Sequence, residues 1–168
     1  RREMAGTFKF NGSYTCGQGI AETKTTQNAP LGQRAVARDL GSDDRGVADF
    51  IYLKGLASTA IGEVVVFNAD DWSTKLAVAN DKGPVAVAMS ANVASQFGWY
   101  QVTGKGSALV ASGFADNGDC YLTSTAGTID DADVAGDYVA NMKGASGISG
   151  GLADVELNHP SVADGTDN

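Results

Sequence analysis

The sequence of 168 residues contains few of the side chains that most enzymes use for catalysis. It has one histidine, His159, and two cysteines, Cys16 and Cys120. A nucleophilic triad needs a histidine beside a serine or cysteine, with an acid that orients it, whereas His159 stands alone in the last predicted strand. Structural zinc usually needs closely paired cysteines, and the two cysteines are far apart in the sequence. These shortages predict a protein that is not an enzyme and holds no metal or cofactor.

Long apolar runs and an excess of basic residues are also missing. No run approaches the roughly 18 apolar residues of a membrane-spanning helix, so we expect no membrane partner. The formal net charge is −8, with 12 Lys and Arg against 20 Asp and Glu. Proteins that bind duplex nucleic acid usually carry an excess of Lys and Arg, which neutralise its phosphates. We therefore expect no nucleic-acid partner either.

The residues that are abundant favour strands and turns over helices. Glycine accounts for 22 residues, and sixteen of the twenty acids are Asp, which favours turns and caps over helix interiors. Short β-prone runs at residues 50–53, 63–67 and 99–102 belong to a series that recurs every ~10–15 residues. This spacing predicts an all-β fold, a small β-barrel or sandwich. Residues 90–96 alone favour a short helical turn, and residues 105–111 are expected to form a hairpin with 99–102.

Two segments indicate which faces of the strands are buried. Residues 84–89 alternate large Val with small Ala, which predicts a strand packed closely on both sides. Trp99 and Tyr100 are adjacent, so their side chains point to opposite faces of a strand. We expect one of these rings in the core and the other exposed or at an interface.

The charge is distributed unevenly along the chain. All five arginines lie in the first 45 residues; residues 1–50 carry a net charge of +1 and residues 51–168 a net charge of −9. We interpret residues 1–48 as an extended N-terminal arm and residues 49–168 as a β-barrel body. The arm has few large aliphatic side chains and must pack against another surface. That surface is either a neighbouring subunit or its own body, to which the arm would contribute the first strands.

Other short motifs lack residues that their chemistry requires. Asp131 and Asp133 begin a sequence like a calcium loop, but Ala135 and Met142 occupy positions that need oxygen ligands. Cys16 and Cys120 leave two alternatives, a disulfide or a pair of free thiols, and free thiols suit a reducing cytoplasm.

An interaction surface is therefore the kind of site that we expect. Arginine and aromatic residues are frequent interface anchors. Trp72 follows two acids in a predicted turn, where its ring either contacts a partner or a sugar or covers one end of the barrel. The candidate contact residues are Phe8, Phe10, Tyr14, Arg34, Arg38, Arg45 and Trp72.

The order of several segments between residues 30 and 162 resembles a group of small structural proteins of tailed bacteriophages, the capsid decoration or cement proteins. These segments are Leu-Gly-Gln-Arg-Ala at 31–35, Ala-Asp-Phe-Ile-Tyr-Leu-Lys-Gly at 48–55, Gly-Glu-Val-Val at 62–65, Gly-Pro-Val-Ala-Val-Ala at 83–88, Gln-Phe-Gly-Trp-Tyr-Gln-Val-Thr-Gly at 96–104, Asp-Cys-Tyr-Leu-Thr-Ser-Thr-Ala-Gly at 119–127 and Val-Glu-Leu-Asn-His-Pro at 155–160. The resemblance implies a β-barrel-like domain bound to the outer surface of a phage head, with no catalytic residues.

The function expected from this resemblance is that of a virion structural protein that bridges neighbouring capsid subunits and stabilises the shell. Its partners would be the major capsid protein and neighbouring copies of itself, including as a trimer. It would reside on the outer capsid surface, and in the host cytoplasm during assembly. The alternative is a carbohydrate- or receptor-binding module of a phage tail or head fibre, with Trp72, Trp99 or Tyr100 stacking on a sugar ring.

Overall fold

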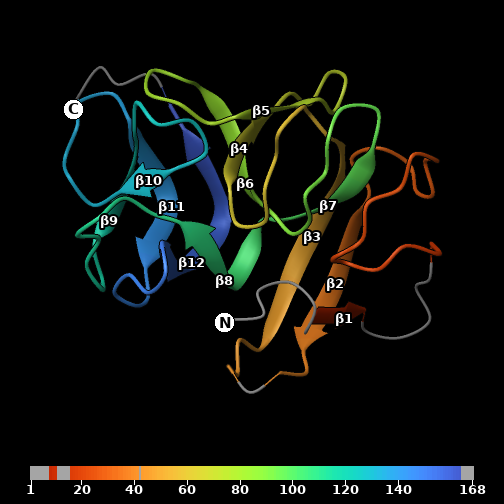
Figure 1. Ribbon diagram of the computed structural model, residues 1–168, viewed down its shortest axis with the longest axis horizontal. Helices are drawn as coiled ribbons and strands as arrows, with labels where there is room; N and C mark the ends of the chain where they lie inside the picture. Colours follow the sequence, from red (N-terminus) through yellow and green to blue (C-terminus); the bar gives the residue numbers. More distant parts are fainter. Residues whose placement is uncertain (1–7, 11–15, 42, 164–168) are drawn as a thin grey trace.

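The structure, a computed structural model, describes residues 8–10, 16–41 and 43–163, and these residues form strands, turns and loops without a helix (Figure 1). The strands in the described part of the chain are β1 (Phe8–Phe10), β2 (Arg34–Asp39), β3 (Val47–Lys54), β4 (Val64–Phe67), β5 (Thr74–Leu76), β6 (Gly83–Ala88), β7 (Phe97–Gln101), β8 (Thr103–Leu109), β9 (Asp119–Leu122), β10 (Ile129–Asp130), β11 (Tyr138–Gly144) and β12 (Leu152–Val162).

All twelve of these strands belong to one antiparallel, strongly curved sheet. Its main path runs β1-β2-β3-β7-β6-β12-β11-β9-β10, while β4 pairs with β6 and β5, and β8 pairs with β12. Among the described residues the path does not return from β10 to β1, so the sheet is not closed. The predicted all-β, barrel-like or sandwich-like fold is confirmed.

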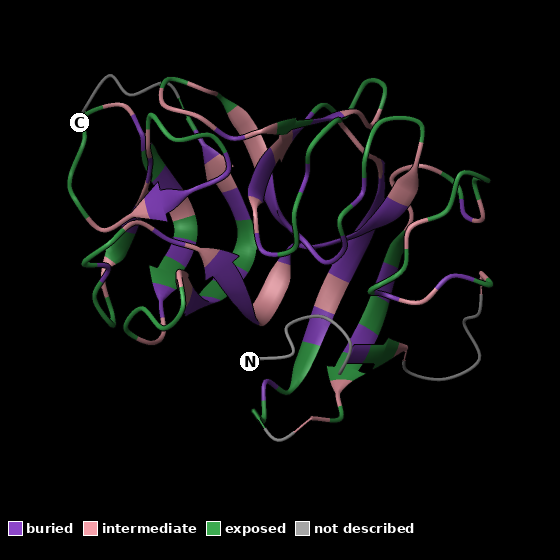
Figure 2. Cartoon of the chain, in the orientation of Figure 1, coloured by how far each residue is buried: buried purple, intermediate pink, exposed green. Residues whose placement is uncertain are grey.

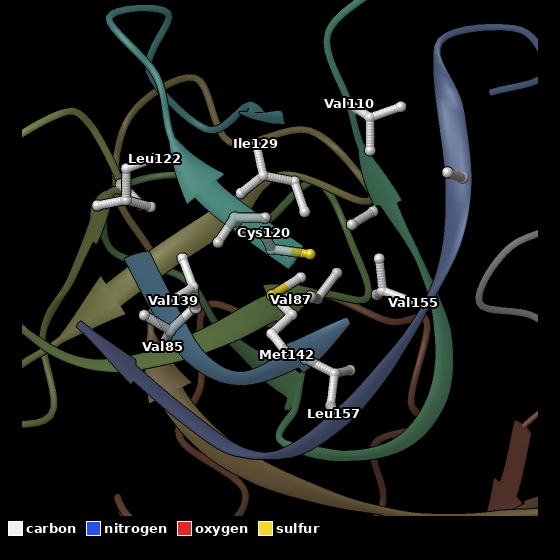
Figure 3. Packing of buried hydrophobic residues seen from close by; sticks show 14 of the residues in the cluster. Val85, Val87, Val110, Cys120, Leu122, Ile129, Val139, Met142, Val155 and Leu157 are labelled. Carbon is white, nitrogen blue, oxygen red and sulfur yellow. The ribbon is translucent and has the colours of Figure 1, made fainter. Parts of the chain in front are cut away.

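The C-terminal half of the sheet wraps around its own apolar core. Figure 3 shows Val85 and Val87 of β6 pointing toward Cys120, Ile129 and Val155, which come from β9, β10 and β12. All five side chains are buried. Because each strand contributes inward-facing residues at alternate positions, this half of the molecule forms a small barrel-like core.

Strand β6 is shared between this core and a second apolar cluster. Val85 and Val87 face the barrel-like core, whereas Ala86 and Ala88 face a cluster that includes Tyr100. All four β6 side chains are at most 1% exposed. The prediction of a strand packed closely on both sides is therefore confirmed for this segment.

A third cluster lies on the opposite face of β3 and β7 and is covered by the N-terminal segment. Phe50, Tyr52 and Trp99 of the sheet are buried there together with Ile20 and Ala29 from the covering residues. The described part of residues 1–48 thus packs against the body of the same chain, with β1 and β2 extending its sheet (Figure 1).

Trp99 and Tyr100 do point to opposite faces, but both are fully buried. Trp99 lies under the N-terminal cover, and Tyr100 lies in the cluster that Ala86 and Ala88 face. The expectation that one ring is exposed or at an interface is wrong, because β7 carries packed layers of its own chain on both faces.

Two local expectations also differ from the structure. Residues 90–96 form a single turn closed by the Gln96 N–H donating to the Val93 carbonyl at 3.1 Å, and no helix. Strand β8 pairs with β12 and not with β7. The reason is that only Val102 separates β7 from β8, which leaves no residues for a hairpin turn.

The shared strand provides a direct test of the two-sided packing. We predict that Ala86→Leu destabilises the protein by about 1–3 kcal/mol, because the added side chain has no space beside the opposite Val65. Urea unfolding followed by tryptophan fluorescence measures the change. The matched control is Ala94→Leu in an exposed turn, for which we expect a change within about 0.5 kcal/mol. Equal stability of both variants would contradict the packing.

Candidate interaction surface

The outward face of β2 carries a pattern of basic and apolar side chains. Arg34, Val36 and Arg38 are exposed at alternate positions, while Ala35 and Ala37 between them are buried (Figure 2). The alternation arises because successive side chains of a strand point to opposite faces, and small alanines permit close packing on the inner one.

The strand register extends this pattern across three strands. Lys9 of β1, Arg38 of β2 and Val47 of β3 lie directly opposite one another and so share a face. The exposed fractions are 44% for Val36, 58% for Leu40 and 57% for Val47, so three aliphatic side chains are open to solvent on neighbouring strands. We call this surface the basic–apolar face; it consists of Lys9, Arg34, Val36, Arg38, Leu40 and Val47, and the half-buried Asp49 lies on it opposite Val36.

Phe8 and Phe10 lie on the reverse side of the same strands. The Phe8 ring packs edge-on against Phe50 at 5.1 Å between centroids, and the Phe10 ring against Trp99 at 5.2 Å. Phe8 is only 2% exposed. Both rings anchor β1 to the chain's own core, so we remove them from the candidate contact residues. Tyr14, another of those candidates, lies outside the described residues.

Arg45 is also used inside the chain. Arg45 is 4% exposed, and its guanidinium donates to Ser107 Oγ at 2.9 Å and to Asp154 Oδ1 at 3.4 Å. It also pairs with Asp43 at 3.0 Å. Since Ser107 belongs to β8 and Asp154 to β12, Arg45 ties the β2–β3 connection to the barrel-like half. Arg45 was predicted to contact a partner, but its side chain is used inside the chain. Its contacts hold β2 and β3, and with them the basic–apolar face, in a fixed orientation relative to the barrel-like half.

Asp39 shapes the start of the same connection. Its carboxylate accepts hydrogen bonds from the Gly41 N–H at 2.9 Å and from the Arg45 N–H at 3.1 Å. Such bonds from an Asp to nearby backbone N–H groups stabilise a turn. Hydrogen bonds from the backbone N–H groups of Gly41 and Arg45, together with those of the Arg45 side chain, therefore fix the connection between β2 and β3.

Trp72 covers one end of a cluster and is half-buried. Its ring stacks on Phe67 at 6.5 Å with an interplanar angle of 26°. A Cβ atom added to Gly32 would come within 2.5 Å of the Trp72 ring, so the ring rests directly on backbone. Of the two sequence interpretations, the structure favours the ring that closes an end of the fold.

Sequence reasoning missed Gln18, which fastens the N-terminal cover. Its carbonyl accepts from Trp99 Nε1 at 3.3 Å, and its side-chain oxygen accepts from the Tyr52 hydroxyl at 2.6 Å. Its amide nitrogen donates to the Phe97 carbonyl at 2.6 Å. Gln18 is 2% exposed. No local signal in the sequence identifies these buried partners.

The residues considered for chemistry lie apart from one another. His159 is exposed, with its Nδ1 at 3.4 Å from Arg34 Nη1. Cys16 and Cys120 are free thiols in different clusters.

Within the described ranges, no group of three or more His, Cys, Asp or Glu side chains is placed to hold a metal ion. Nor does that part of the chain contain a helix long and apolar enough to cross a membrane.

No family model matches the sequence, and no curated protein matches it significantly.

The Arg45 contacts predict a large loss of stability when the guanidinium is removed. Arg45→Met leaves the carboxylate of Asp154, which is 2% exposed, without its closest cationic partner. We expect a loss of about 3–5 kcal/mol in urea unfolding, and substantial recovery in the double variant with Asp154→Leu. Arg38→Met is the control, since that side chain is exposed, and we expect a change within about 0.5 kcal/mol. Equal effects at Arg45 and Arg38 would show that the buried ion pair adds nothing.

The two thiols are expected to react very differently. Burial, followed by the charges of Asp119 and Asp131, raises the pKa of Cys120 to about 12. Because the thiolate is the reactive form, Cys120 stays protonated and inert at pH 8 in the folded protein. A thiol-specific disulfide reagent should therefore modify Cys16 alone before unfolding and both thiols in denaturant. The variant Cys16→Ser should then show no reaction until it unfolds, and rapid native labelling of that variant would contradict the placement.

Proposed function

We propose that this chain is a structural protein of a tailed-bacteriophage virion, a decoration protein that binds the outer surface of the capsid. The observation that carries the proposal is the basic–apolar face, which concentrates cations and exposed aliphatic side chains on an otherwise acidic chain. In this proposal the face docks on the major capsid protein and bridges neighbouring subunits.

The chemistry of the face suits such a contact. Val36, Leu40 and Val47 supply apolar area that becomes buried on docking. Arg34 and Arg38 supply charges that pair with carboxylates of a partner and steer its approach. The anchored β2–β3 connection lowers the entropy lost on binding, because the contact residues are already in place.

The rest of the chain supports the same proposal through its charge. Residues 51–168 carry a net charge of −9, and like charges keep densely arrayed copies from aggregating. A bridging protein bound in many copies also gains avidity from neighbouring contacts. We therefore include adjacent copies of the same chain, as in a trimer, among the proposed partners. The proposed location is the outer capsid surface, reached from the host cytoplasm during assembly.

The alternative of sugar binding through Trp99 or Tyr100 finds no support in the packing. Both rings are 0% exposed, and Trp72 is held against Phe67 and Gly32. No catalytic role enters the proposal, which concerns attachment alone.

The proposal is tested by cosedimentation with shells assembled from the major capsid protein of the same phage. We expect the double variant Arg34→Ser and Arg38→Ser to weaken binding at least about ten-fold, because it removes two charges from the contact. We also expect binding of the unaltered chain to weaken with rising salt, as exposed charge pairs do.

The matched control removes two charges elsewhere. Lys24→Ser with Lys75→Ser produces the same change of net charge at exposed positions outside the basic–apolar face. We expect its shell binding to remain within about two-fold of the unaltered chain. Full binding by the arginine variant would exclude the face as the contact, and failure of the unaltered chain to bind any such shell would overturn the proposed function.

A further inference from the structure

A depression of about 500 Å³ is lined by residues of β9, β11 and β12. Figure 1 shows these strands in the opposite half of the molecule from β1 and β2. This volume is within the range of about 300–1,000 Å³ typical of small-ligand sites. Its polar and aromatic lining includes Asp119, Tyr138, Asn141, Lys143, Glu156 and Asn158.

The polar groups of this depression are not used inside the described part of the chain. Lys143 lies directly across from Asp119 on one neighbouring strand and from Glu156 on the other. No ion pair forms with either carboxylate among the described residues, and the Asn141 and Asn158 amides likewise have no side-chain hydrogen bond there. The depression therefore offers both donors and acceptors to a ligand.

An exposed aromatic pair borders the same depression. Tyr138 of β11 lies directly opposite Tyr121 of β9, with ring centroids 5.6 Å apart. Tyr138 is 46% exposed, which leaves much of its side chain open to solvent. Desolvation, followed by the charges of Asp133 and Asp119, raises the pKa of Tyr121.

A local irregularity of β11 turns these side chains outward. The register with β12 shifts between Ala140 and Met142, and Asn141 has a φ of 62°. The extra residue places Tyr138, Asn141 and Lys143 on the exposed side while Val139 and Met142 remain buried. Asparagine adopts a positive φ more readily than most residues other than glycine, so the bulge is accommodated at Asn141.

We propose that this depression binds a neutral oligosaccharide, with one sugar ring stacked on Tyr138. The faces of pyranose rings carry C–H groups that pack on an aromatic side chain, and their hydroxyl groups both donate and accept. The lining supplies both partners: carboxylates of Asp119 and Glu156 accept, Lys143 donates, and the two asparagine amides do both. Two carboxylates against one lysine disfavour phosphates and acidic sugars. This site goes beyond the proposed shell attachment and does not depend on it.

The experiment uses isotope-labelled full-length chain and four hexasaccharides as probes. Cellohexaose, maltohexaose and chitohexaose are the neutral probes, and hexagalacturonate is the anionic one. We expect at least one neutral probe to shift the amide signals of β9, β11 and β12 at concentrations up to about 10 mM, and the anionic probe to shift none of them. Titration calorimetry then gives the affinity of the neutral probe that binds.

Three variants separate stacking from hydrogen bonding. Tyr138→Ala is expected to lower the affinity at least about ten-fold, whereas Tyr138→Phe keeps the ring and stays within about three-fold. Asn141→Gly removes the amide but tolerates the positive φ, and we expect a loss of about three- to ten-fold. Ile61→Ala, at an exposed position outside the lining, is the control and should leave the affinity unchanged.

Four results would overturn the proposal. They are no shift from any neutral probe, equal binding of the anionic probe, an affinity unaffected by all three site variants, and a self-association, measured by light scattering, that Tyr138→Ala abolishes. The variant Arg34→Ser with Arg38→Ser should bind sugar normally. Loss of shell binding in that variant with retained sugar binding therefore tests the two proposals separately.

Discussion

The whole architecture depends on two strands that are buried on both faces. In β4, Val64 faces the barrel-like core and Val65 faces the neighbouring cluster, and β6 divides its Val and Ala residues in the same way. Because each of these strands closes two apolar cores at once, the two halves of the chain cannot separate without exposing both. A substitution in either strand therefore changes the packing of both clusters, so we expect the two halves to unfold together as one cooperative unit.

The two proposed surfaces occupy parts of the molecule that this shared sheet holds apart. The basic–apolar face lies on β1, β2 and β3, and the depression beside Tyr138 lies on β9, β11 and β12. Figure 1 shows these two groups of strands in opposite halves of the molecule. Arg45 connects the two halves through Ser107 and Asp154. A protein attached through one surface would consequently present the other at a constant orientation, and the two binding events would compete for no side chain.

Much of the fold could be predicted from the sequence, because apolar runs and glycine-rich turns report local structure. The strand at 84–89 and its two-sided packing follow from the Val and Ala alternation alone. The partner of β8 could not be predicted, because its pairing with β12 joins residues about fifty positions apart. No short motif in the sequence near either strand indicates such a pairing. Residue type alone gave the wrong prediction at Arg45 and Phe8, because arginine and aromatic residues are common in interfaces. In the structure Arg45 is buried against Asp154, and Phe8 is buried against the Phe50 ring. Arg34 and Arg38, in contrast, are exposed as an interface requires.

Strand β12 has a consequence for how the chain is made. It pairs with β6, β8 and β11, and it contributes Ala153, Val155 and Leu157 to the barrel-like core. While the ribosome still covers residues 152–162, that core lacks one wall and its partner strands have open edges. Newly made chains must therefore wait until this segment leaves the exit tunnel before they complete the sheet. In that interval β8 lacks the one strand with which it pairs among the described residues, whereas β6 already has β4 and β7 beside it.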